Sequence, residues 1–260
     1  MNLGISDSWF IVCGAGSGFG RAVAERLIEE GAGVIAVART DSVLRQFEDR
    51  NIHKQRLITV CADITKDETQ ERLILLSKDL KLHGIFINAG GPPATTAVET
   101  RIEAWDEAYQ YLLRWKIQLV MKLLPVFRKQ SYGRVLLLES ISVKQPVENL
   151  VLSNSLRSAV IGWIKTLSQE LAPEHITINV LAPGYHDTAA MQRLFAKLSA
   201  IRGTSLEESR KHYEFKIPVG RLGQASELAS LSAWLLSPIS GFVTGQTISH
   251  DGGSVSGIFG

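Results

Sequence analysis

Cys13-Gly14-Ala15-Gly16-Ser17-Gly18-Phe19-Gly20 is the stretch of sequence that decides the fold. A run with strand character, Trp9–Cys13, leads into it, and a helical run, Phe19–Glu30, follows it and ends at Gly31. Glycines at such a turn let backbone N–H groups approach a pyrophosphate, and the helix N-terminus adds the positive end of its dipole. A strand before the turn and a helix after it are the context that a dinucleotide site requires. The predicted cofactor contacts in this stretch are Gly14, Ser17, Gly18, Phe19 and Gly20.

Strand-like and helical runs alternate along the rest of the chain, without a linker, a repeat or a low-complexity tract. The other predicted strands are Val34–Ala38, Arg56–Ala62, Gly84–Asn88, Arg134–Leu138, Ile176–Leu181 and Thr247–His250. The fifth of these seven strands is apolar on both faces, as a covered parallel sheet requires. Repeated crossovers predict an α/β fold, a doubly wound (Rossmann) parallel seven-stranded sheet with helices on both faces. We expect a single domain over residues 1–260.

Helical signals complete this prediction. Long helices are expected over residues 101–129 and 151–171. Thr65 and Glu68 have the spacing of a capping box, which would begin the helix that follows the third strand.

Composition excludes several classes of function. Hydrophobic residues make up 45% of the chain and charged residues 21%, which are ordinary values for a globular protein. With a formal net charge of +2 and no Lys/Arg stripe interleaved with aromatic residues, nothing indicates a nucleic-acid partner. No run approaches the ~18 uncharged apolar residues of a membrane span, and Met1–Ser8 lacks the features of a signal peptide. We therefore expect a cytoplasmic protein without a nucleic-acid or membrane partner.

The two cysteines stand at the ends of the first and third predicted strands, at Cys13 and Cys61. If the strand order is 3-2-1-4, two strand spacings, roughly 9–10 Å, separate them. A disulfide needs Cα atoms within about 7 Å. We expect free thiols and predict no metal site.

Further motifs follow the glycine turn in a fixed order. They are Asp63-Ile64, Asn88-Ala89-Gly90, Asn179…Pro183-Gly184…Thr188, Arg221-Leu222-Gly223 and Asp251-Gly252-Gly253. Together they resemble the short-chain dehydrogenase/reductase family, whose loop reads T-G-x-x-x-G-x-G, with Cys13 in place of the threonine. The resemblance spans about residues 8–254. It implies that Asp63 holds an adenine ring, that Asn88–Gly90 supports the strand beside a nicotinamide cofactor, and that the Pro183-Gly184…Thr188 segment contacts the nicotinamide amide.

The end of the second strand bears on the choice of cofactor. An acidic side chain there binds the ribose 2′-OH of NAD, whereas an arginine accommodates the 2′-phosphate of NADP. The sequence reads Val37-Ala38-Arg39-Thr40, with no acid. Because the arginine fork donates paired hydrogen bonds to phosphate, Arg39 favours NADP(H) over NAD(H). A solvated surface arginine is the alternative.

The resemblance implies four catalytic residues, of which the chain has one. Ser140 matches the serine that orients a carbonyl oxygen. Ser153 stands where the family has its tyrosine acid, Arg157 where it has a lysine, and Leu112 where it has an asparagine. A serine hydroxyl is a poor general acid near neutral pH, and arginine stays protonated. The sequence therefore predicts an atypical active site.

Other residues are candidates for the missing proton donor. His186, just past the Pro-Gly pair, titrates near neutrality, and the alternative is an exposed loop histidine. Lys144, one turn beyond the serine, can act as acid or base when desolvated, and the alternative is a surface lysine. Tyr185, and Ser153 acting through a water chain, are further candidates. Glu139 points away from its neighbouring serine by strand alternation, so it is left outside the predicted site.

Residues 186–217 resemble the family's mobile substrate lid. The apolar helical face that can cover a substrate consists of Met191, Leu194, Phe195 and Leu198. Lys and Arg outnumber acids in this segment, which indicates an anionic substrate, with a solvated amphipathic face as the alternative. The nearest subgroup by resemblance is the 3-oxoacyl-carrier-protein reductases. Ser131 and Glu174 stand where those enzymes present basic residues, so the carrier-protein substrate is not carried over.

The leading hypothesis is an NADP(H)-dependent oxidoreductase that acts on a small carbonyl or alcohol. A non-catalytic NADP-binding protein, or a subunit of a mixed oligomer, is the first alternative. A lyase or isomerase is the second, because a fold does not set its chemistry. The resemblance also implies a homodimer or homotetramer, through helices 101–129 and 151–171 and the C-terminal segment around Ile248 and Ile258.

Overall fold

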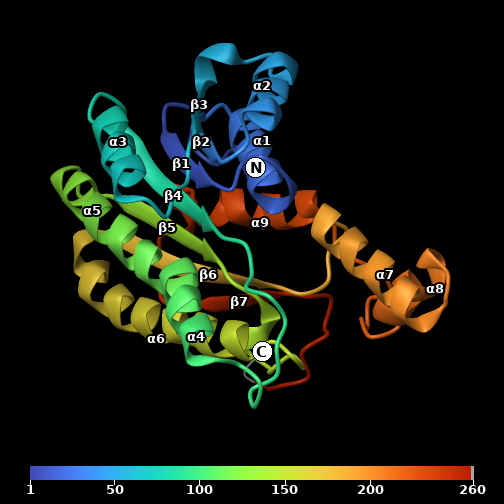
Figure 1. Ribbon diagram of the computed structural model, residues 1–260. Helices are drawn as coiled ribbons and strands as arrows, with labels where there is room; N and C mark the ends of the chain where they lie inside the picture. Colours follow the sequence, from blue (N-terminus) through green and yellow to red (C-terminus); the bar gives the residue numbers. More distant parts are fainter. Residues whose placement is uncertain (259–260) are drawn as a thin grey trace.

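The computed structural model describes residues 1–258, and its strands form one parallel sheet (Figure 1). In chain order the strands are β1 (Trp9–Cys13), β2 (Gly33–Ala38), β3 (Leu57–Cys61), β4 (Leu82–Asn88), β5 (Gly133–Leu138), β6 (Ile176–Pro183) and β7 (Thr247–His250). Their order across the sheet is β3-β2-β1-β4-β5-β6-β7, and each neighbouring pair is parallel. The predicted fold class, the seven strands and the 3-2-1-4 order are confirmed.

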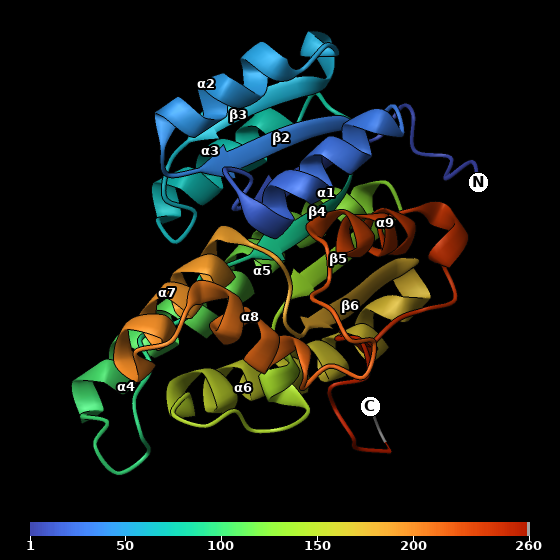
Figure 2. The same cartoon turned by 90° about the vertical axis from the view of Figure 1, so that its right-hand side faces the viewer.

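Helices cover both faces of this sheet (Figures 1 and 2). One face carries α1 (Gly18–Glu29), α2 (Asp41–Arg50) and α9 (Ala225–Leu235). The other face carries α3 (Asp67–Ser77), α5 (Trp115–Lys129) and α6 (Val151–Leu171). Each face has its own buried apolar core, because a parallel sheet in a doubly wound fold is covered on both sides.

Strand β5 shows how side chains are divided between the two cores. Val135 and Leu137 pack on the α5 and α6 face, whereas Leu136 and Leu138 pack on the α1 and α9 face. Successive residues of a strand point to opposite faces. The next residue, Glu139, is therefore expected on the face that α5 and α6 cover.

The long helix expected over 101–129 is present, with a local change of pitch. It consists of α4 (Ile102–Tyr109), a π-helical turn (Gln110–Arg114) and α5. A π-turn inserts an extra residue and shifts the side chains that follow. Leu112, inside this turn, is fully buried in the core.

The capping box expected at Thr65 and Glu68 is wrong. Helix α3 begins at Asp67, and its N-cap residue is Lys66, which makes no side-chain capping bond. The backbone N–H and the hydroxyl of Thr65 both donate to Asp63, at 3.0 and 2.8 Å. These bonds form a local turn before the helix, and the helix begins two residues later, at Asp67.

The segment between β6 and α9 contains α7 (Ala189–Arg202) and α8 (Leu206–Glu214), which project from the body of the molecule in Figure 1. A small separate apolar cluster holds this segment to the protein, formed by Met191, Phe195, Ile217 and Leu222 with Tyr185 and Tyr213 at its edge. Of the predicted apolar face, Met191 and Phe195 are buried and Leu198 is half-buried, but Leu194 is exposed.

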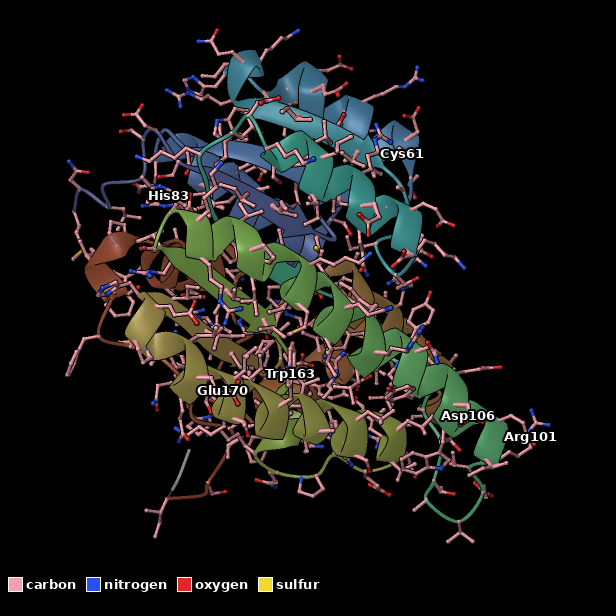
Figure 3. The ribbon with its side chains drawn as sticks, turned by 90° about the vertical axis from the view of Figure 1, so that its left-hand side faces the viewer. Cys61, His83, Arg101, Asp106, Trp163 and Glu170 are labelled. Carbon is pink, nitrogen blue, oxygen red and sulfur yellow. The ribbon has the colours of Figure 1, made fainter. Side chains whose placement is uncertain are left out.

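Both cysteines are free thiols, as predicted; Cys13 is buried and Cys61 is exposed. Cys61 ends β3, and His83 lies near the start of β4, at the opposite end of the strands (Figure 3). Within residues 1–258, no helix combines the length and the apolar character that crossing a bilayer demands.

Candidate active site

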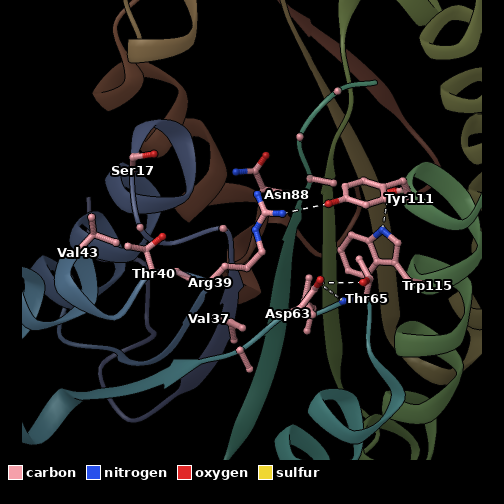
Figure 4. A pocket seen from close by; sticks show the side chains of 18 residues that line it. Ser17, Val37, Arg39, Thr40, Val43, Asp63, Thr65, Asn88, Tyr111 and Trp115 are labelled. Carbon is pink, nitrogen blue, oxygen red and sulfur yellow. Dashed lines mark hydrogen bonds between the residues drawn. The ribbon is translucent and has the colours of Figure 1, made fainter. Parts of the chain in front are cut away.

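A pocket of about 430 Å³ lies at the carboxyl ends of β1 to β4 (Figure 4). This is where a doubly wound sheet binds its ligand, because the strand order reverses between β1 and β4. The predicted cofactor residues that line it are Gly14, Ser17, Arg39, Asp63, Ile64, Asn88, Ala89 and Gly90. Two residues that the sequence did not single out, Tyr111 and Trp115, complete its wall from the π-turn and α5.

The glycine turn packs α1 against β1 with no room for a side chain at Gly14 or Gly20. Gly14 has a φ of +69°, and a Cβ there would lie 2.9 Å from the side-chain nitrogen of Asn88. A Cβ on Gly20 would lie 2.3 Å from the carbonyl oxygen of Gly14. Gly18 faces open space, and the N-cap residue Ser17 makes no side-chain capping bond. The N–H groups of the first turn of α1 are thus available to an anion, and this cradle fits a pyrophosphate.

Asp63 is held ready to accept a hydrogen bond. Its Oδ1 accepts from the backbone N–H and the hydroxyl of Thr65, at 3.0 and 2.8 Å. Burial acts to raise the pKa of Asp63, but these bonds and the positive charges of Arg39 and Lys66 outweigh it and lower the pKa. The carboxylate is therefore ionised near neutral pH, and Oδ2 can accept a hydrogen bond from a donor such as an adenine amino group.

Arg39 extends across the pocket from the end of β2 (Figure 4). Its Nη1 donates to the hydroxyl of Tyr111 at 3.0 Å. The sequence offered no signal for this contact, because it depends on how the π-turn orients Tyr111.

Ser153 and Arg157 lie one turn apart on the buried face of α6. Nε of Arg157 donates to Oγ of Ser153 at 3.0 Å. Nη2 of the same guanidinium donates to the carbonyl oxygen of Gly90 at 3.3 Å, which connects the pair to the wall of the pocket at the ends of β1 to β4. Both residues are buried.

Beneath this pair lie two charged residues that the predicted site leaves out. Nζ of Lys116 lies 2.6 Å from Oε1 of Glu139, and Nη1 of Arg157 lies 2.7 Å from Oε2 of the same carboxylate. The side chains of Lys116 and Glu139 are 0% exposed. Burial lowers the pKa of Lys116, against the opposing effect of the Glu139 carboxylate.

Alternation along β5 predicted correctly that Glu139 points away from Ser140, but Glu139 still contacts the predicted site residue Arg157. The residue does lie on the face of Val135 and Leu137, but α5 and α6 bring Lys116 and Arg157 to that same face. One sequence signal could have revealed the cluster. Lys116 interrupts an otherwise apolar helical face that is made by Leu112, Leu119, Val120 and Leu123.

Ser140 and Lys144 flank a short 3₁₀ helix, Ile141–Val143, just after β5. Oγ of Ser140 accepts a bond from the backbone N–H of Ser142 at 3.1 Å, which fixes the first turn of this helix. Lys144 is the half-buried residue that ends it. Both residues lie on the loop between β5 and α6, and the hydroxyl proton of Ser140 remains available to a ligand.

His186 is buried, not an exposed loop residue, and both of its ring nitrogens are engaged. Nδ1 lies 3.1 Å from the carbonyl oxygen of Gly184, and Nε2 lies 2.8 Å from Nδ1 of His250. A carbonyl only accepts, so Nδ1 carries the proton and Nε2 of the neutral ring accepts from His250. Burial lowers the pKa of His186, only partly offset by the bond to Gly184. The ring has no proton for a substrate unless it moves.

The end of β6 carries the other predicted contacts. Pro183 is the last residue of β6, and the backbone N–H of Gly184 donates to the carbonyl oxygen of His250 at 3.1 Å. Thr188 is the N-cap residue of α7, and its hydroxyl accepts from the N–H of Met191 at 3.4 Å. The proton of this hydroxyl is available to an amide oxygen.

A second cavity, of about 260 Å³, adjoins the loop after β5. It is lined by Ile141, Gln145, Pro146, Val147, Glu148, Tyr185, Lys216, Ser254 and Val255. Burial raises the pKa of Tyr185, so its phenol is neutral near physiological pH. This cavity offers a mixed apolar and polar surface beside the 3₁₀ helix that follows Ser140.

Comparison with known proteins agrees with this architecture. A family model described as "Enoyl-(Acyl carrier protein) reductase" matches residues 14–255. "Dehydrogenase/reductase SDR family member 4" of Sus scrofa is 28% identical over 256 residues, which cover 95% of this chain and 86% of the relative. "NADPH-dependent reductase BacG" of Bacillus subtilis (strain 168) is 25% identical over 252 residues, which cover 95% of this chain and 97% of the relative.

Among solved structures, an actinorhodin polyketide ketoreductase variant with NADPH superimposes with a TM-score of 0.89. It is 26% identical, and the match covers 96% of this chain and 98% of that one. The sheet order, the glycine cradle and these near full-length matches lead to one assignment. The chain belongs to the short-chain dehydrogenase/reductase family, whose matching model spans residues 14–255.

Proposed function

We propose that this protein is an NADP(H)-dependent oxidoreductase of the carbonyl reductase or alcohol dehydrogenase type, with Ser153 and Arg157 in the positions of the family's tyrosine and lysine. One observation carries the proposal. The buried Ser153–Arg157 pair is hydrogen-bonded to Gly90, which lines the pocket that fits the dinucleotide. Two relatives support it, since BacG is named as NADPH-dependent and the ketoreductase was solved with NADPH.

The residues of the pocket fit NADP(H). The first turn of α1 would hold the pyrophosphate, Asp63 the adenine and Arg39 the 2′-phosphate. Pro183, Gly184 and Thr188, at the end of β6, would hold the nicotinamide amide. When bound, the dinucleotide supplies the hydride that reduces a carbonyl carbon.

In this proposal, Ser153 donates a hydrogen bond to the carbonyl oxygen of the substrate. Since the Nε–H of Arg157 can only donate, Oγ of Ser153 accepts that bond and its own proton is free for a ligand. The guanidinium keeps its positive charge and stabilises negative charge that develops on Oγ. This stabilisation is stronger in a buried site than in water. Ser140 would bind the same carbonyl oxygen from the β5 side.

Lys144 and His186 are the other candidates for the proton donor. Lys144 lies on the loop that follows Ser140 and is not among the residues that line the second cavity. Both nitrogens of His186 are occupied by Gly184 and His250. This favours Ser153 over either residue as the group nearest to the reacting oxygen.

Residues 186–217 are proposed to close over the substrate. Three exposed cations of this segment, Arg193, Lys197 and Arg202, form no ion pair with any of residues 1–258. In contrast, Arg210 pairs with Asp187 and Glu214 of the same segment, and Lys211 pairs with Glu207. Unpaired cations on a lid favour a substrate that carries an anionic group.

A homodimer or homotetramer is proposed through α5 and α6. Met121 on α5 is 51% exposed, and Trp163 lies on α6, the neighbouring helix (Figure 3). An isologous contact between two such helix pairs would cover these side chains. Mass measurement in solution that gives only a monomer would contradict this part of the proposal.

The function is tested by NADPH oxidation, followed by absorbance, against ketones, diketones and 3-oxoacyl thioesters, with cofactor binding read by fluorescence. Turnover of NADPH with reduction of a carbonyl is the expected result. Binding of NADPH without turnover of any substrate would instead support a non-catalytic NADP-binding protein. Conversion of a substrate without a change in the cofactor would support a lyase or isomerase.

A further inference from the structure

Lys116, Glu139 and Arg157 form a buried row of three charges between α5, β5 and α6. The carboxylate of Glu139 lies between the two cations, at 2.6 Å from Lys116 and 2.7 Å from Arg157. None of the three side chains is more than 6% exposed. The far end of the row contacts Ser153, through Nε of Arg157.

Lys116 is the member of this row that needs an explanation. Glu139 and Arg157 already form a neutral ion pair, and taking another charge out of water is unfavourable. The neighbouring side chains on the same face of the helix, Leu112 and Val120, are apolar and fully buried. An apolar residue at position 116 would therefore fit at a lower energetic cost. What the lysine adds is charge, since two cations and one anion leave the row with a net positive charge.

We propose that Lys116 is a positioning residue of the active site, which offsets the charge of Glu139 so that the positive field of Arg157 reaches Ser153 undiminished. The inference deepens the proposed function and rests on the roles given there to Ser153 and Arg157. Lys116 is not among the residues that line the pocket, and its ammonium group donates to Glu139. It would act on Ser153 through the positive charge that it adds beside Glu139.

The physical consequence follows from where Ser153 sits. Without Lys116, the guanidinium would face an opposite charge at 2.7 Å, which would offset part of its electrostatic effect at Oγ of Ser153. With Lys116 in place, negative charge on Oγ or on a substrate oxygen beside it is stabilised. The lysine also holds Glu139 from the opposite side, which fixes the angle at which Arg157 meets Ser153 and Gly90.

The test measures the field at Ser153 directly, without relying on turnover. Ser153→Cys places a titratable thiol where Oγ stands, and the thiolate is followed by its ultraviolet absorbance as a function of pH. Cys61→Ser removes the exposed native thiol from the background. Burial raises the pKa of Cys13 to about 12, so that thiol does not titrate in the range of interest.

Lys116→Met is then introduced into this background. The expected result is a rise of the pKa of the introduced thiol by about one to two units, the size of effect that a unit charge has at this range in a protein interior. Lys122→Met is the matched control. It removes a lysine from the same helix that also forms ion pairs at 2.6 Å, with Asp67 and Glu71 at the surface. This control should leave the thiol pKa unchanged.

A double variant separates charge from geometry. Lys116→Met with Glu139→Gln removes one cation and one anion, so the net charge of the row is the same as in the parent. The thiol pKa should return to within about half a unit of the parent value. The kcat of the corresponding Ser153 protein should fall about 10- to 100-fold for Lys116→Met alone and return to within about threefold of the parent value in the double variant. If the double variant folds and neither value recovers, the charge assignment is overturned.

Folding of the single variant is not required for the decision. If Lys116→Met alone does not fold, the comparison is made in the Glu139→Gln background, where the same lysine substitution must still raise the thiol pKa. An unchanged thiol pKa in a folded Lys116→Met protein, in either background, shows that the lysine is only structural. Failure of the proposed function has a different signature, because the wild-type protein would then show no NADPH turnover while the thiol shift persists.

Discussion

Nη1 of Arg39 and the hydroxyl oxygen of Tyr111 are 3.0 Å apart, in a hydrogen bond that joins the end of β2 to the π-turn before α5. The two residues are separated by 72 positions in the chain. Because a guanidinium only donates, the tyrosine oxygen accepts this bond, and the phenolic proton is free for a ligand oxygen. A phosphate bound beside Arg39 would thus meet donors from two walls of the pocket.

Arg39→Ala is expected to weaken NADPH binding at least tenfold and NADH binding much less. A hydrogen bond to a charged group is worth about 1.5–3 kcal/mol, and only NADPH has the 2′-phosphate. Fluorescence titration with both cofactors measures the two dissociation constants. Arg45→Ala, which removes an exposed arginine of α2 paired with Asp41, is the control and should change neither. Equal weakening for both cofactors would show that Arg39 does not read the phosphate.

Ser153→Ala is expected to lower kcat by about 10²-fold or more, the usual effect of losing a positioned proton donor. NADPH affinity should stay near the wild-type value, since Arg157 and the glycine cradle remain. Ser158→Ala is the control, because the hydroxyl of this exposed serine of α6 donates to the carbonyl oxygen of Asn154 in its own helix. Full activity of Ser153→Ala would direct attention to Lys144 and His186 as the proton donor.

Glu139→Ala is expected to cost about 3–5 kcal/mol in the free energy of unfolding, because it leaves two buried cations without their shared partner. Urea denaturation monitored by circular dichroism gives this value. Glu174→Ala breaks an exposed pair with Arg128 and should have a much smaller effect. If Glu139→Ala lowers the free energy of unfolding as little as an exposed pair does, the buried row does not contribute to the stability of the fold.

Cys13 should make the protein less stable at alkaline pH. Burial raises the pKa of its thiol to about 12, whereas the thiol of an unfolded chain ionises near 9. Between these pH values only the unfolded state releases the thiol proton. The contribution of Cys13 to the free energy of unfolding is therefore fully present below pH 9 and decreases by about 1.4 kcal/mol per pH unit above it. Cys13→Ala should flatten this part of the stability profile, and Cys61→Ser should not. Chemical denaturation at pH 8 to about 10.5 provides the comparison.

His83 should make the protein less stable at acidic pH. Burial, with the positive charges of Lys81 and Arg134, lowers the pKa of this imidazole to about 4 from 6.5. As pH falls through this window the unfolded chain binds a proton that the folded protein does not, so stability decreases. His83→Asn should reduce the slope of thermal stability between pH 6.5 and 4. His53→Asn, at an exposed position, serves as the control, and an equal change there would rule out the assignment to His83.

Local patterns in the sequence were sufficient for the sheet, and eight of the predicted cofactor residues line the pocket at its edge. Each strand is a short run whose neighbours along the chain are helices, and right-handed crossovers restrict how such runs can pair. These predicted residues follow the ends of successive strands, and those ends meet at one edge of a parallel sheet. Gly14, Asp63 and Asn88 were therefore predictable as lining one pocket, although they are far apart in the chain. The capping box predicted at Thr65 was wrong, because Thr65 forms a local turn with Asp63 and the helix begins at Asp67.

The chemistry beneath the pocket was decided by tertiary structure alone. Alternation along β5 determines which face Glu139 occupies, but only the packing of α5 and α6 on that face brings Lys116 and Arg157 to it. Likewise, Tyr111 lies in the π-turn and accepts a hydrogen bond from Arg39 at the end of β2. The buried ring of His186 bonds to His250 at the end of β7. Sequence periodicity predicts which side of a helix or strand a residue lies on. It does not predict the partner of a buried charge, which another element must supply at hydrogen-bond distance. That partner can be named only once the helices are packed.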